Sequence, residues 1–196
     1  MIDSIVRWDT EVILWFQNNL RTGWLDPIMR AISFVGGNKG VFWISLCLIL
    51  LCFRKTRRVG IVVSMSLLFA FVLNNLIIKN MVDRVRPYES IEGLILLGDP
   101  EIDSSFPSGH VSCVVSIGVG LLLSAKNKLP GILVLVFSVL TGISRIYVGA
   151  HHPSDVIVSY FTATLMAVLA YLLFRAIENR VKKRKEEKDD ADAMMV

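Results

Sequence analysis

The sequence predicts an all-α integral membrane protein with about six transmembrane helices, of which five are clear and one, at the N-terminus, is weak. Apolar residues make up 54% of the 196 residues, a larger share than in ordinary soluble domains. They gather into five runs, and Lys and Arg cluster at the ends of these runs, as in the cytoplasmic loops of membrane proteins. The net charge of +4 therefore indicates membrane loops, and we expect no binding to nucleic acid.

The five runs are each bounded by polar or charged residues. They cover residues 40–53, 59–78, 111–125, 130–148 and 156–176. A helix needs about 20 residues to cross about 30 Å of hydrocarbon, and the second, fourth and fifth runs reach that length. The first and third runs must extend into flanking residues, 34–39 and 107–110 respectively. Five such runs in succession disfavour the alternative of a soluble all-α protein with buried helices.

The N-terminal third is less apolar. Residues 10–20 and 24–35 are amphipathic, and the nearby tryptophans are typical anchors at a membrane interface. These segments either lie in the interface or together make the weak sixth crossing. We expect one domain over residues 1–176 with an N-terminal interfacial helix, followed by a charged cytoplasmic tail, 177–196. The start of the chain does not have the pattern of a removable signal peptide.

The basic segments give an orientation. Residues 54–58, 126–128 and 175–188 fall on one side if the five spans alternate, and the positive-inside rule assigns that side to the cytoplasm. The connections 80–108 and 149–154 then lie outside. We therefore expect a multi-pass protein of the plasma or inner membrane with a cytoplasmic C-terminus and an external site.

Three cations lie at the edges of these external connections. Lys79, Arg86 and Arg145 would neutralise a phosphate if they converge, and arginine does so with paired N–H donors. Ionisable groups near a bilayer are costly and usually functional. Each cation alone would be interpreted as a side chain that snorkels to the interface, and that simpler interpretation is kept for Arg84.

A short segment with the letters PSGH opens the third run. Its helix N-terminus offers unpaired N–H groups to an anion, and Gly109 lets the backbone approach an oxyanion. Ser108 either caps the helix or donates to phosphate. His110, in the first turn, is suited to giving a proton to a leaving oxygen.

His151 precedes Asp155 by four residues, so the two side chains share a face on a helix or tight turn. The carboxylate could hold one imidazole N–H and make the other nitrogen nucleophilic. The alternative is a loop histidine followed by a helix-capping aspartate, and His152 has no partner at a useful spacing. A metal held by both histidine segments is disfavoured by the surrounding cations. We expect neither a metal nor another cofactor.

These segments resemble the three signature motifs of the type 2 phosphatidic acid phosphatase (PAP2) superfamily, which includes bacterial acid phosphatases and vanadium haloperoxidases. In the family's order, the matching residues are Lys79-x6-Arg86-Pro87, Pro107-Ser108-Gly109-His110 and Ser144-Arg145-x5-His151-x3-Asp155. The likeness spans residues 40–176 and implies a PAP2/chloroperoxidase-like helical core. One departure is Ser159, where the family often has glycine.

The resemblance implies a metal-independent phosphatase that forms a phosphohistidine. His151 would attack phosphorus in line, Asp155 would hold its imidazole, and His110 would protonate the leaving oxygen and then activate water. The phosphate would be held by Lys79, Arg86, Ser108, the backbone of Gly109, and Arg145.

An external site embedded in the membrane fits a lipid phosphate of the outer leaflet. Because the short layout is similar to bacterial polyprenyl-diphosphate phosphatases, the expected reaction is undecaprenyl diphosphate to undecaprenyl phosphate, a step of cell-wall biosynthesis. Phosphatidylglycerol phosphate and phosphatidate are the alternative substrates. A lipid phosphotransferase would use the same residues. A transporter would need polar residues inside the spans, where only Asn74 and Asn75 stand out.

The external loop of residues 82–106 is acidic. Its carboxylates could form a rim that shapes the choice of substrate or could keep the loop solvated, and we favour solvation. They are Asp83, Glu89, Glu92, Asp99, Glu101 and Asp103.

Overall fold

A computed structural model describes residues 2–37 and 40–193, and helices are the only extended elements within those ranges. The predicted all-α class is therefore confirmed. The elements are α1 (Ile2–Leu20), α2 (Leu25–Gly36), α3 (Val41–Cys52), α4 (Arg57–Phe71), the π-helix η2 (Val72–Ile78), α5 (Lys79–Val82), α6 (Pro87–Ser90), α7 (Gly109–Ser124), α8 (Leu129–Tyr147) and α9 (Pro153–Ala193).

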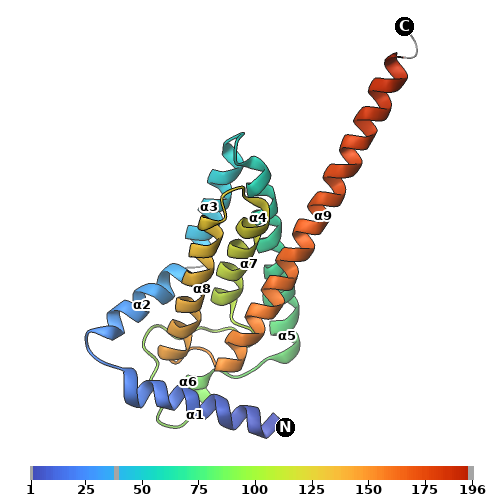
Figure 1. Cartoon of the computed structure of the whole chain (residues 1–196). Coiled ribbons are helices and arrows are strands. Elements are labelled where there is room, and N and C mark those ends of the chain that lie inside the picture. The colour runs from blue at the N-terminus through green and yellow to red at the C-terminus, as the bar shows by residue number, and fades with distance from the viewer. Residues whose placement is uncertain (1, 38–39, 194–196) are drawn as a thin grey trace.

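Helix α7 is the centre of a bundle with α4, α8 and α9, and α3 packs against α4 (Figure 1). Its valines and Ile117 are buried among these neighbours. Glycines allow the close approach of α7 and α8, because a Cβ atom at Gly131 would lie 2.7 Å from the backbone nitrogen of Leu122. Leucines on the outer faces of α3, α8 and α9 are exposed, as expected of surfaces that contact lipid.

The membrane-spanning character is supported by length and composition. Three helical stretches are long and apolar enough to cross a membrane, namely Arg57–Ser90, Leu129–Tyr147 and Pro153–Asp192. Helices α2 and α3, which bend by 45°, could together make a fourth span, and α7 is a shorter apolar helix. The protein is thus a multi-pass membrane protein, but the predicted number of six spans is not confirmed.

The two ends of the bundle differ in what they carry. The α3–α4 turn, the α7–α8 connection and the far part of α9 lie at one end, while α1, α5 and α6 lie at the other (Figure 1). The basic segments and the motif segments are therefore separated, as the alternation of spans predicts. Helix α1 lies across the motif end instead of along the bundle (Figure 1). Its placement relative to a membrane, and the side that each end faces, stay predictions.

The π-helix η2 interrupts the long stretch between α4 and the first motif cation. At its end the backbone N–H of Lys79 donates to the carbonyl of Asn74, five residues earlier. Asn74 is fully buried, and its amide donates to Ser112 Oγ of α7 at 2.8 Å. Wider helical turns of this kind are rare and frequently occur at functional sites. Here the π-helix leads directly into Lys79.

Candidate active site

The three motif segments converge at the end of the bundle that α1 covers. A cavity of about 1600 Å³ opens there. Of the predicted site residues, those that line it are Lys79, Gly109, His110, Arg145 and His151. Arg86, Ser108 and Asp155 are buried and do not belong to its lining.

Two carboxylates from the acidic loop occupy the space between the cations, and we call them the pocket carboxylates, Glu101 and Asp103. Arg145 donates to Glu101 Oε1 at 2.6 Å. Arg86 pairs with Glu101 Oε2 at 2.7 Å and with Asp103 Oδ1 at 2.6 Å, and Lys79 pairs with Asp103. The interpretation of these two acids as solvating charges is wrong. They stand where the oxygens of an anionic ligand would bind.

The pocket carboxylates are strongly acidic. Burial alone would raise the pKa of Glu101, but Arg145 and the other nearby cationic groups outweigh burial and lower that pKa to about 2. Burial likewise opposes ionisation of Asp103, but Lys79 and Arg86 lower its pKa to about 2. Both groups are therefore negatively charged at neutral pH, and the cations of the site are neutralised from within the chain.

His151 presents a free ring nitrogen. Its Nδ1 lies 2.7 Å from the carbonyl oxygen of Ser105. Because a carbonyl can only accept, Nδ1 carries the proton and Nε2 has the lone pair. Nε2 is buried and has no hydrogen-bond partner among the described residues. Burial, followed by the charges of Arg145 and Arg86, lowers the pKa of His151 well below its usual value, so the ring is neutral and can act as a nucleophile.

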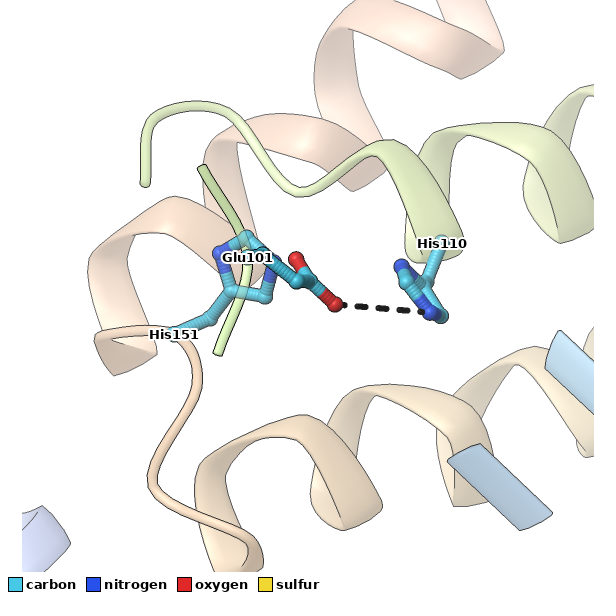
Figure 2. A group of neighbouring side chains, drawn as sticks. All are labelled: Glu101, His110 and His151. Atoms are coloured by element: carbon cyan, nitrogen blue, oxygen red, sulfur yellow. Dashed lines mark ion pairs between the residues drawn. The ribbon is translucent and has the colours of Figure 1, made fainter. Parts of the chain in front are cut away.

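His110 faces the same space from α7. The ring centroids of His110 and His151 are 6.5 Å apart. Figure 2 shows Glu101 between the two rings, with its Oε1 atom 4.0 Å from His110 Nε2. The separation leaves room for a tetrahedral group between the two imidazoles once Glu101 has moved away.

Asp155 lies next to His151 but does not bond its ring. Asp155 Oδ2 is 3.7 Å from His151 Nδ1, too far for a hydrogen bond. It accepts from Ser105 Oγ at 2.5 Å and from the backbone N–H of His152 at 2.9 Å, while Oδ1 accepts from Arg84 at 2.5 Å. Since His152 precedes α9, the capping alternative is realised as well. The direct contact that the spacing suggested is replaced by one through Ser105.

The PSGH segment is held by the residue that departs from the family pattern. The backbone N–H of Ser108 donates to Ser159 Oγ at 2.8 Å. Ser108 Oγ is buried without a partner in the described part of the chain, and it makes no capping bond to α7. Gly109 approaches η2 closely, because a Cβ atom there would lie 3.0 Å from Asn75 Nδ2. Only glycine fits this contact without a shift of the neighbouring amide.

Several residues that support the site could not be identified from the sequence. Arg84 bridges Asp155 and Asp9, a buried carboxylate of α1, so its interpretation as a snorkelling cation is wrong. Ser33 of α2 accepts from Arg145 Nη1 at 2.7 Å. Asp9 lies immediately before the amphipathic segment 10–20, and no spacing in the sequence connects it to the later motifs.

The charges around the two histidines disfavour a bound metal. Ligand atoms of Glu101, His110 and His151 lie within 4.8 Å of one another, so the carboxylate beside both histidines is Glu101 and not Asp155. Both oxygens of Glu101 already accept from arginines. Three surrounding cations favour an anion at this position.

Known proteins are similar to this chain in sequence and in fold. Residues 59–178 match the PAP2 superfamily. A protein of Sulfolobus acidocaldarius named undecaprenyl-diphosphatase is 35% identical over 146 residues, which cover 74% of this chain and 69% of that protein.

Two solved structures share the fold. The structure of Aquifex aeolicus LpxE superposes with a TM-score of 0.69 at 27% identity and covers 82% of this chain and 92% of its own. The PAP2 type phosphatidylglycerolphosphate phosphatase of Bacillus subtilis superposes with a TM-score of 0.71 at 25% identity, covering 91% and 88%. The family match contains all three motif segments and more than half of the sequence. The chain therefore belongs to the PAP2 superfamily.

Proposed function

We propose that this chain is a membrane lipid phosphatase that hydrolyses undecaprenyl diphosphate to undecaprenyl phosphate. The observation that carries the proposal is the continuity of the cavity. Its polar end holds the histidines and cations described above, and its other end lies between α2, α3 and α4. Apolar residues line that second end, among them Ile44, Leu48, Leu51, Leu68 and Phe71. A phosphate headgroup and a hydrocarbon tail fit these two environments.

The phosphate would replace the pocket carboxylates. Its oxygens would take the hydrogen bonds that Arg86 and Arg145 now give to Glu101, and Lys79 would exchange Asp103 for phosphate. Arginine and lysine both bind phosphate through charge-assisted hydrogen bonds. The backbone N–H of Gly109 and the unpaired hydroxyl of Ser108 would add neutral donors at the start of α7.

The reaction would then proceed in two steps. His151 Nε2 forms a bond to phosphorus while the bond between phosphorus and the leaving oxygen breaks, and His110 gives that oxygen a proton. His110 next takes a proton from water, whose oxygen attacks phosphorus, breaks the N–P bond and releases phosphate. The neutral, unpartnered Nε2 and the 6.5 Å between the rings support this assignment. A nucleophile and an acid–base partner on opposite sides of the phosphorus satisfy in-line displacement.

The proposed substrate is based on the names of the similar proteins and on their sequence identities to this chain. The relative with 35% identity is named for undecaprenyl diphosphate, whereas the Bacillus subtilis structure, at 25% identity, is named for phosphatidylglycerol phosphate. We therefore place the diphosphate first and phosphatidylglycerol phosphate second. The site lies at the end opposite the three basic segments, which supports an external site in the outer leaflet and a cytoplasmic C-terminus.

Phosphate release by the detergent-purified protein tests the proposal. Undecaprenyl diphosphate, phosphatidylglycerol phosphate and phosphatidate are compared in the presence of EDTA, with His151→Ala alongside. We expect the wild type to release phosphate fastest from undecaprenyl diphosphate and the variant to release none. When the substrate carries a labelled phosphate and the reaction is stopped without acid, the wild type should also contain a labelled phosphohistidine. A preference for another lipid would overturn the substrate assignment alone. Equal rates with and without His151 would overturn the mechanism.

A further inference from the structure

We propose that Asp9 and Arg84 are positioning residues for the nucleophile, acting on His151 through Asp155 and Ser105. This inference rests on the proposed function, because it assigns roles in the same reaction. It makes α1, which lies outside the residues that match the family, a part of the catalytic apparatus.

Asp9 is the first link. It is fully buried although its preceding neighbours on α1 are exposed. Its Oδ2 accepts from Arg84 Nη2 at 2.7 Å and from Ser154 Oγ at 2.5 Å, and its Oδ1 accepts from the backbone N–H of Ser154 at 2.8 Å. A buried carboxylate is costly unless donors satisfy it. All of these donors belong to the segments that build the site.

Arg84 is the second link, because one guanidinium joins two buried carboxylates. Nη2 bonds Asp9, while Nη1 donates to Asp155 Oδ1 at 2.5 Å and to Ser154 Oγ at 2.7 Å. The planar fork of arginine can serve both carboxylates at fixed angles, which a lysine ammonium cannot reproduce. The position of Asp155 is therefore set from both sides, by its own helix α9 and by α1.

Ser105 transmits this position to the nucleophile. Its hydroxyl donates to Asp155 Oδ2 at 2.5 Å, and its backbone N–H donates to the carbonyl of Arg84 at 2.8 Å. Its own carbonyl accepts the Nδ1 proton of His151 at 2.7 Å. Because Asp155 is 3.7 Å from that nitrogen, the carbonyl of Ser105 selects the tautomer. A shift of Asp155 would move the acceptor and release the imidazole.

Three variants test the network kinetically. Asp9→Asn, Arg84→Gln and the double variant are compared with Asp3→Asn, which changes an exposed acid of the same helix. We expect Asp9→Asn to lower kcat by about 10- to 100-fold, the range that misplacement of a reacting group produces, with KM within about twofold. The double variant should be no slower than Arg84→Gln, since residues that act in one chain are not additive. Asp3→Asn should match the wild type.

A second readout does not depend on turnover. In protein labelled with nitrogen-15 at histidine, the His151 signals, assigned by their loss in His151→Ala, should report the Nδ1–H tautomer. Asp9→Asn and Ser105→Ala, which keeps the carbonyl but removes the hydroxyl link, should both shift them toward a mixture of tautomers. Unchanged signals together with unchanged kcat would overturn the network. A wild type that hydrolyses none of the lipids would instead overturn the proposed function, and the tautomer would still decide the network.

Discussion

Glu101→Gln should increase the affinity of the site for phosphate. In the structure this side chain bonds Arg86 and Arg145, the cations that would hold the substrate, and a phosphate must displace it before it can bind. Glutamine keeps the shape but removes the negative charge. The variant therefore weakens the internal competitor while it leaves the cations in place.

The size of the effect follows from the acidity of Glu101. A pKa lowered from 4.5 to about 2 corresponds to about 3 kcal/mol of preference of the site for the ionised carboxylate. Glutamine still accepts hydrogen bonds from the arginines, so the variant loses only part of this free energy. We expect phosphate to bind the variant more tightly than the wild type by about half of it. Since about 1.4 kcal/mol equals a factor of ten, the inhibition constant of inorganic phosphate should fall about tenfold.

Competitive inhibition of lipid hydrolysis by inorganic phosphate, supported by calorimetric titration of phosphate into the purified protein, measures this constant. Glu92→Gln is the matched control, because Glu92 is an exposed acid of the same loop and should leave the constant unchanged. An unchanged or weaker affinity in Glu101→Gln would refute the idea that this carboxylate occupies the phosphate position.

Three further predictions address the supports of the site. In Gly37→Ala the new Cβ atom would lie 1.9 Å from His110 Nε2, so the ring must turn away and kcat should fall at least about tenfold. The control is Gly23→Ala, where the new Cβ atom would meet nothing within 4 Å. A normal kcat in Gly37→Ala would contradict the assignment of His110. Ser33→Ala removes the bond that holds Arg145, worth about 1 kcal/mol, and should raise KM about fivefold at constant kcat; an unchanged KM would show that Arg145 needs no such support. The pocket carboxylates, each with a pKa of about 2, should contribute stability that is complete above the unfolded pKa of about 4 and is lost as the pH falls toward 2. The thermal midpoint of the wild type should therefore fall more steeply between about pH 4 and 2 than that of Glu101→Gln/Asp103→Asn, and equal slopes in the two proteins would contradict this.

The residues that the sequence could identify are those whose chemistry is unusual for their surroundings. Lys79, Arg145 and His110 lie at the ends of apolar helices, where ionisable side chains near a membrane are energetically costly and usually functional. The structure places them around one cavity. The bounds of α3, α4 with η2, α7 and α8 agree with the first four apolar runs to within two residues. Helix α7 begins at Gly109 and so gains only two of its four expected flanking residues. The fifth run is different, because α9 continues to Ala193, through most of the segment expected to form a separate charged tail.

The residues that the sequence could not identify are those whose partners are distant or whose type is ordinary. Glu101 and Asp103 have the composition of any solvated loop, and only the folded position of the loop brings them to the cations. Asp9 bonds a residue 75 positions away. His151 and Asp155 have the spacing of neighbours on a helix, but α9 begins at Pro153, so the rule does not apply to a pair that straddles the helix start.

The π-helix has a consequence for how this protein can diverge. Lys79 follows seven residues of widened turn, and the direction of its side chain depends on the rotation accumulated over those turns. One residue lost or gained before Asn75 would rotate Asn75 and Lys79 together away from the cavity that both line, and a change after Asn75 would rotate Lys79 alone, even if every apolar side chain were kept. The segment can therefore exchange one aliphatic residue for another, but its length is constrained. A related sequence whose alignment needs a gap in this stretch is expected to bind phosphate with a different set of cations.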